Sequence, residues 1–119
     1  MLLGRVVGQV VATRKHEALV GYRLLCIRPH GFHEPAHPVD LIIAVDVLGA
    51  GPGEDVVVCF GEPARRCSRD TSGERQGFDL PIEAAVAAIV DSIDLDPAVI
   101  AGLRRPLHLR ERLQTGTGA

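Results

Sequence analysis

The sequence predicts a mainly β protein: a small five-stranded OB-like β-barrel with short helical segments, including a C-terminal helix. Its 119 residues fit one domain with a modest core. Apolar residues make up 46% of the chain and aromatic residues only 3%, so valine, leucine, isoleucine and alanine must fill that core. These residue types suit short strands. The apolar runs also have strand length and are separated by connections rich in glycine, proline or charge.

The first two strands are expected to form a hairpin. Residues 3–13 alternate, and their even-numbered positions are apolar or glycine throughout, which is the period of a strand. Gly8 inside this run predicts a bulge or a close approach of backbone. Residues 19–27 form the second predicted strand, with Gly21 early in it. Only the short polar segment 14–17 separates the two runs, so we expect the two strands to pair as a hairpin.

The third and fourth strands flank a glycine segment. Residues 28–38 contain several prolines and predict a loop. The run 39–48 is nearly all apolar and predicts a strand, and residues 55–60 predict the next one. Between them lies the segment 49–53, Gly-Ala-Gly-Pro-Gly.

The fifth strand is harder to assign. Residues 61–67 predict one helical turn with Pro63 early in it, and the polar residues 68–79 predict a loop. In residues 81–93 the alanines favour a helix, whereas the alternation of valine and alanine favours a strand. We predict a strand over 85–93, because four strands need a partner that closes the sheet.

The C-terminal part predicts one short helix. Asp96 is a helix N-cap residue and is followed by proline, which is favoured at the first helical position. A helix over 97–104 follows, and Pro106 ends it. The glycine- and threonine-rich residues 114–119 are expected to fray.

Charge and cysteine content restrict the class of protein. The formal net charge of −2 argues against a nucleic-acid-binding protein, which needs a basic surface. The three cysteines, Cys26, Cys59 and Cys67, are odd in number and form no CxxC pair, which predicts a reduced, cytosolic protein. No run approaches the ~20 apolar residues of a membrane span, and the N-terminus lacks the features of a signal peptide.

The glycine segment resembles a phosphate-binding loop but departs from its pattern. A dinucleotide-binding loop requires G-x-G-x-x-G between a strand and a helix. Here Gly49, Gly51 and Gly53 are spaced by two, and Glu54 stands where the third glycine belongs. The strand pattern that follows leaves no helix N-terminus to receive a phosphate. The segment therefore predicts a tight turn between strands.

The sequence offers one weak metal site and no catalytic constellation. His30, His33 and His37 lie in one proline-restricted loop, and imidazole binds zinc, copper or nickel. No cysteine is nearby to complete a structural zinc site, so a solvated loop is the favoured interpretation. A small metal-dependent enzyme built on these three histidines stays open as an alternative. No acid pairs with a histidine or serine at an informative spacing, so the sequence predicts neither an enzyme nor a cofactor.

Several motifs occur in an order that resembles one known family. They are residues 8–15, 19–25, 44–56, 61–65 and 86–91. In sequence they read GQVVATRK, LVGYRLL, AVDVLGAGPGEDV, GEPAR and VAAIVD. Together they are similar to the EutN/CcmL family of bacterial microcompartment vertex proteins. The resemblance covers roughly residues 3–94, so we expect a shell-vertex domain over 1–94 and a C-terminal extension over 95–119.

The resemblance implies a structural role. It implies a homopentamer that caps the fivefold vertices of a polyhedral shell in the cytoplasm, beside hexameric and pseudohexameric shell proteins. It implies no catalysis, no cofactor, no nucleic acid and no membrane. The candidate assembly residues, taken from motif position, are Gly49, Ala50, Gly51, Arg65 and Asp91. The family often has serine where this chain has Glu62, so any contact of that hydroxyl is in doubt.

An OB-fold binding module for a nucleic acid or a small ligand is the alternative function. OB barrels bind single strands through stacked aromatic side chains. Tyr22, Phe32, Phe60 and Phe78 are the only aromatic residues in the chain. With so few aromatic residues and an acidic net charge, the sequence disfavours this alternative.

Overall fold

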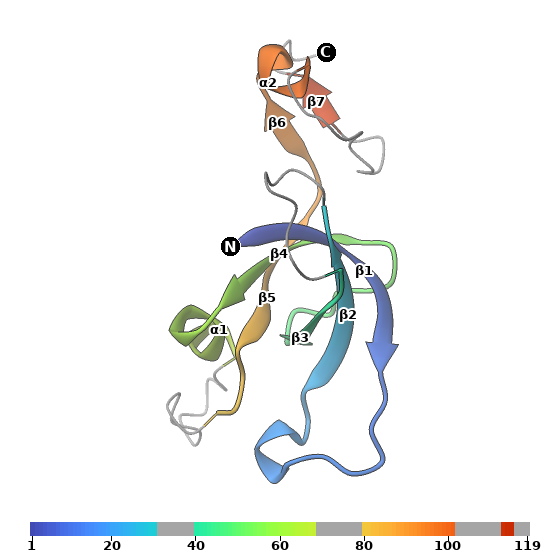
Figure 1. The fold of residues 1–119 in the computed structure, drawn as a ribbon, viewed down its shortest axis with the longest axis vertical. Coiled ribbons are helices and arrows are strands. Elements are labelled where there is room, and N and C mark those ends of the chain that lie inside the picture. The colour runs from blue at the N-terminus through green and yellow to red at the C-terminus, as the bar shows by residue number, and fades with distance from the viewer. Residues whose placement is uncertain (31–39, 69–79, 102–112, 116–119) are drawn as a thin grey trace.

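The protein is a closed five-stranded β-barrel (Figure 1). The computed structural model describes residues 1–30, 40–68, 80–101 and 113–115. The strands follow the order β1-β2-β3-β5-β4 around the barrel. Their bounds are β1 Leu2–Val10, β2 Arg23–Pro29, β3 Ile42–Asp46, β4 Asp55–Phe60 and β5 Ala84–Val90. The prediction of a mainly β, five-stranded barrel is confirmed.

Strand pairing closes the barrel without leaving an edge. β1 pairs antiparallel with β2 and with β4, β2 with β3, and β4 with β5. β3 and β5 run parallel and are joined at Val45 and Ala85. The predicted hairpin of the first two strands is confirmed. The register of β1 against β2 shifts between Val6 and Gly8, so the bulge that Gly8 predicted is present.

The inside of the barrel is filled by aliphatic side chains from alternate strand positions. On β1 the buried residues are the even-numbered Leu2, Gly4 and Val6, as the alternation predicted. The largest side chains fully buried in this core are Val6, Leu25, Ile27, Val56, Val58 and Val86. Alternation thus places one side of each strand in a dry interior.

A second apolar cluster lies outside the barrel, beneath α1 (Glu62–Cys67). Its buried members are Tyr22, Val45, Cys59, Ala64, Leu80, Ile82 and Ala85. Val45, Cys59 and Ala85 are the sequence neighbours of inward-facing residues, so they point outward from β3, β4 and β5. These strands are buried on both sides there, which explains why they are nearly continuous apolar runs. We call this group the outer cluster.

α1 confirms the predicted helical turn at 61–67. Gly61 precedes it with φ +66°, a left-handed conformation that favours glycine, and Pro63 lies in its first turn. At its C-terminal end the backbone N–H of Ser68 donates to the carbonyl of Ala64 at 3.1 Å. The Tyr22 hydroxyl donates to the Ser68 carbonyl at 2.6 Å. α1 thus continues from β4 at its start and is held by Tyr22 at its C-terminal end.

Two predicted strands begin or end elsewhere. β1 stops at Val10 rather than residue 13, and β2 starts at Arg23 rather than residue 19. Residues 17–19 form a 3₁₀ helix instead, because the His16 side chain accepts a hydrogen bond from the Ala18 N–H at 3.1 Å and caps it. Gly21 then turns the chain with φ +88°. Residues 40–41 and 47–48, predicted as strand, lie outside β3 (Ile42–Asp46).

The C-terminal part differs most from expectation. β5 ends at Val90 rather than residue 93, and a new strand, β6 (Ile93–Leu95), follows. β6 pairs in parallel with β7 (Leu113–Thr115), which includes two residues expected to fray. Figure 1 shows β6, α2 and β7 grouped beyond one end of the barrel. A three-residue strand has too few positions for a period, so the sequence did not reveal this pair.

α2 (Pro97–Ala101) begins where the sequence placed the helix. The Asp96 carboxylate accepts from the Ala98 N–H at 2.8 Å, as an N-cap does. Residues 102–104 and Pro106 of that prediction lie outside the described residues, as do most of the predicted loops 28–38 and 68–79. No helix among the described residues is long and apolar enough to span a membrane.

Candidate functional site

The glycine segment is built around a buried carboxylate. The Asp46 side chain is fully buried and accepts backbone N–H bonds from Leu48 at 2.9 Å, Gly49 at 3.1 Å and Ala50 at 2.8 Å. The Arg23 guanidinium lies 3.3 Å from the same carboxylate. Converging amide donors of this kind bind phosphate in other proteins. Here the carboxylate of the chain itself takes that place, which argues against nucleotide binding.

The second half of the segment is joined to β1. The Gly51 N–H donates to the Glu54 carboxylate at 2.7 Å, and the Glu54 N–H donates to the Gly51 carbonyl at 3.1 Å. The Gly53 N–H donates to the Val6 carbonyl at 2.7 Å, and the Val6 N–H donates to the Glu54 carbonyl at 2.9 Å. Gly49 and Gly53 have φ near +86° and +81°, where a side chain would be strained. We call residues 46–54 the glycine turn.

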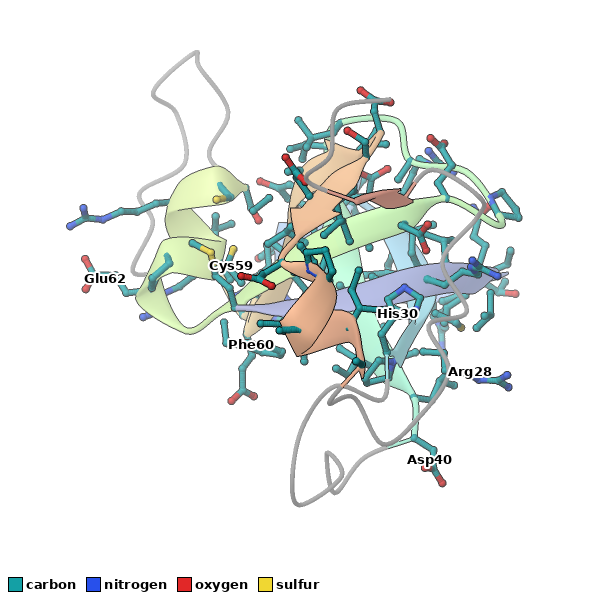
Figure 2. The ribbon with its side chains drawn as sticks, turned by 90° about the horizontal axis from the view of Figure 1, so that it is seen from above. Arg28, His30, Asp40, Cys59, Phe60 and Glu62 are labelled. Atoms are coloured by element: carbon teal, nitrogen blue, oxygen red, sulfur yellow. The ribbon has the colours of Figure 1, made fainter. Side chains whose placement is uncertain are left out.

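A charged cluster lies at the start of β4, beside this turn. Asp55 is buried and its Oδ1 lies 3.0 Å from Nε2 of His30 and 3.3 Å from Nε of Arg5. His30 is itself buried, at the end of β2 (Figure 2). Sequence reasoning missed the partnership with Asp55, since the residues are distant in the chain and meet only through strand pairing.

Of the three histidines that were weak candidates for metal binding, only His30 lies in the described part of the chain. His30 contacts Asp55, whereas His33 and His37 lie outside the described residues. Within the described ranges, no group of three His, Cys, Asp or Glu side chains is placed to hold a metal ion.

Three of the five candidate assembly residues belong to the turn that leads into β4, and a fourth, Asp91, follows the β5 residue that pairs with the start of β4. Gly49, Ala50 and Gly51 belong to the glycine turn, where Ala50 is fully buried within the protomer. Val90, the last residue of β5, pairs with Asp55, the first of β4. Asp91 follows directly and is exposed at the same end.

Arg65 lies at the other end of β4. It belongs to α1, which follows the last residue of β4, and its side chain is half-buried. Among the described residues, neither the Arg65 guanidinium nor the Asp91 carboxylate takes part in an ion pair. The neighbouring Arg66 differs, because it pairs with Glu62 at 2.7 Å on the exposed side of the helix.

Exposed apolar side chains gather along β3 and the start of the glycine turn. Leu41, Ile43, Val47 and Leu48 are each 45–50% exposed. Ile43 pairs with Cys26 of β2 on the outer side of the barrel. We call these four residues the β3 apolar surface. Exposed apolar side chains beside the turn are candidates for a protein contact.

The aromatic residues do not form a stacking platform in the described part of the chain. Tyr22 is buried in the outer cluster and Phe60 packs against the barrel core. Phe32 and Phe78 lie outside the described residues. The two described aromatic residues therefore serve packing.

Comparison with known proteins gives one consistent family. A family model described as "Ethanolamine utilisation protein EutN/carboxysome" matches residues 1–91. Carboxysome shell vertex protein CcmL of Thermosynechococcus vestitus is 36% identical over 96 residues, covering 81% of this chain and 89% of the relative. Bacterial microcompartment shell vertex protein PduN of Salmonella typhimurium is 40% identical over 96 residues, covering 78% and 98%.

A solved structure agrees with these relatives. The GrpN pentameric microcompartment shell protein from Rhodospirillum rubrum superimposes with a TM-score of 0.59 at 37% identity, covering 78% of this chain and 96% of that one. The family model spans the whole barrel, and the relatives exceed 30% identity over most of this chain and of their own length. The chain therefore belongs to the EutN/CcmL family.

Proposed function

We propose that this protein is a structural component of a bacterial microcompartment shell, where it forms homopentamers that cap the fivefold vertices. The similarity to GrpN, a pentameric shell protein, carries this proposal, because that similarity covers 78% of this chain and 96% of GrpN. The curated relatives are named as shell vertex proteins, which supports a structural and not an enzymatic role.

The proposed vertex role rests on the geometry of a closed shell. Hexameric tiles form flat sheets, and a flat sheet does not close into a polyhedron. A ring with fivefold symmetry introduces the curvature that closure needs. Hexameric and pseudohexameric shell proteins are therefore the proposed neighbours, in a shell within the cytoplasm, without nucleic acid and without a cofactor.

A cyclic ring needs two different surfaces on each protomer, because its contacts are head-to-tail. The barrel offers such a pair. One surface includes α1 with Arg65, and the other includes the glycine turn with Asp91. The β3 apolar surface beside the glycine turn supplies apolar area. We assign Arg65 and Asp91 to opposite sides of each ring contact, and Gly49, Ala50 and Gly51 to the backbone that shapes it.

The chain is further assigned a vertex domain over residues 1–94 and an extension over 95–119. Two observations support a division close to this point, just after β5. The family model ends at residue 91, and β6 pairs with β7 rather than with a barrel strand.

The purified protein is expected to be a pentamer. Native mass spectrometry at micromolar concentration should show five copies as the dominant species. A chain ending at residue 94 should give the same stoichiometry if the vertex domain alone forms the ring. A dominant monomer or hexamer of the full chain would contradict the proposal.

The vertex role itself is tested in the host. Deleting the gene, with any paralogue also removed, should leave shells that are elongated or open when viewed by electron microscopy. Shells of normal closed shape in that strain would rule out vertex capping even if the protein is a pentamer in solution.

Charge reversal at Arg65 or Asp91 should weaken the ring. Arg65→Glu and Asp91→Lys are each expected to raise the concentration at which the pentamer dissociates by at least about tenfold, because like charges then meet across the contact. The double variant should recover much of the loss. Dilution followed by mass photometry measures this concentration.

Matched controls lie close to both residues. Arg66→Glu makes the same change one position along α1, and Asp94→Lys makes it three residues beyond Asp91 in an exposed part of β6. Both controls should leave dissociation unchanged. Equal effects of Arg65→Glu and Arg66→Glu would remove Arg65 from the interface.

A further inference from the structure

Two cysteine thiols meet where α1 packs on the barrel. Sγ of Cys59 lies 3.6 Å from Sγ of Cys67. Cys59 is on β4 and is buried in the outer cluster, beside α1 (Figure 2), whereas Cys67 ends α1 and is exposed. The eight-residue separation forms no redox motif in the sequence, so only the folded chain reveals the pair.

The fold holds both thiols near bonding geometry. Ala64 is fully buried against the barrel, and the Tyr22–Ser68 hydrogen bond fixes the chain just after Cys67. A disulfide needs the two sulfurs to approach to about 2.05 Å. Because Cys67 is exposed and Cys59 is buried, rotation of the Cys67 side chain is the motion that would bring the sulfurs together.

We propose that Cys59 and Cys67 form a reversible dithiol–disulfide pair, oxidised by a small disulfide such as glutathione disulfide, which covalently ties the end of α1 to β4. This refines the expectation of three reduced thiols, because the pair is reduced or oxidised according to its surroundings. Both cysteines lie within one protomer, so the disulfide needs no second copy of the chain.

The chemistry has two exchange steps. The exposed Cys67 thiolate attacks one sulfur of glutathione disulfide, forms a mixed disulfide and releases one glutathione thiolate. The Cys59 sulfur loses its proton and attacks the Cys67 sulfur, forming the Cys59–Cys67 bond and releasing the second glutathione thiolate. The cysteines lose two electrons to glutathione, and the two thiol protons pass through solvent to the glutathione thiolates.

The second step requires the buried Cys59 thiol to ionise. Burial, and then the neighbouring Cys67 thiol, raise the pKa of Cys59 from 9.0 to about 11. A backbone hydrogen bond at Cys59, and then the N-terminal amine, act in the opposite direction and lower this pKa. Tyr22 belongs to the same outer cluster, and the Ala85 carbonyl of β5 lies 3.4 Å from the sulfur. Burial persists in the mixed disulfide, whereas the Cys67 thiol is consumed in the first step. Since the thiolate is the nucleophile, closure should accelerate as the pH rises toward the pKa of Cys59.

The test uses the full chain with Cys26→Ser, which removes the third thiol. After incubation with glutathione disulfide and alkylation, the intact mass should show an internal disulfide without bound glutathione. Trypsin cleaves at Arg65 and Arg66, so a cross-linked peptide should join Cys59 to Cys67. The oxidised protein should melt about 5 °C or more above the reduced one, and dithiothreitol should reverse the shift.

A second variant separates the two steps. Cys59→Ala in the same background should stop at a single glutathione adduct on Cys67. Three results for the Cys26→Ser protein would overturn the proposal: a stable glutathione adduct on Cys67, a covalent dimer through Cys67, or no reaction. If Cys26→Ser fails to fold, the unaltered chain is mapped after additional cleavage at the acidic residues between Cys26 and Cys59, which places the two cysteines on separate peptides and shows whether Cys59 is the one joined to Cys67.

Discussion

Gly4→Ala is expected to lower the free energy of unfolding by about 2–3 kcal/mol, because it forces a methyl group between two paired strands. A Cβ atom at this position would lie 2.5 Å from Cγ2 of Ile27 and 2.9 Å from the backbone oxygen of Arg28. Ile27 is fully buried in the barrel core and the oxygen belongs to β2, so neither can move freely. Urea unfolding at a fixed protein concentration measures the loss.

Gly8 provides the matched control on the same strand. A Cβ there would lie 3.7 Å from Cβ of Cys26, which is an ordinary contact. Gly8→Ala should therefore change stability by less than about 0.5 kcal/mol. Equal unfolding midpoints for Gly4→Ala and Gly8→Ala would show that β1 and β2 are less tightly packed at Gly4 than these distances imply.

Asp46→Ala is expected to cost about 3 kcal/mol, since it leaves three backbone donors of the glycine turn without their acceptor. One of these donors belongs to the buried Ala50, which water cannot easily reach. Asp46→Asn should cost roughly half as much, because the amide keeps one acceptor oxygen. Thermal and urea unfolding both report the change.

Asp40→Ala is the control for this series. Asp40 is exposed, just before β3, so its replacement should be nearly neutral, within about 0.5 kcal/mol. If Asp46→Ala lowered the free energy of unfolding no more than Asp40→Ala does, the glycine turn would not depend on its internal carboxylate. This carboxylate would then no longer count against nucleotide binding.

The sequence correctly located those strands and helices that have a clear local pattern of residues. β4 has the predicted bounds, and α1 follows Gly61 with its proline in the first turn, because these are local properties of the chain. Alternation in residues 2–10 also identified the inner side of β1 correctly. Gly8 was rightly associated with a bulge, but the close backbone approach lies at Gly4, which alternation alone does not distinguish.

Errors arose where an apolar residue is buried outside a strand. Leu19 and Tyr22 were assigned to the second strand because they are apolar. In the structure Tyr22 is buried in the outer cluster, Leu19 packs against it, and both precede β2. The glycine turn was also only partly predictable. An aspartate just before a glycine-rich segment suggests a turn that its side chain caps. Its partners at 48, 49 and 50 nevertheless appear only in the fold.

Hydrophobic period, turn chemistry and motif order are properties of the linear chain, so the amino-acid sequence was enough to predict the barrel, the boundaries of its best-patterned elements and the family. Which distant residues meet became visible only in the folded chain: Asp55 with His30, Cys59 with Cys67, and β6 with β7. The fold also separates Arg65 from Asp91, at opposite ends of β4. Strand register and helix packing set these distances, and neither is encoded by spacing along the sequence.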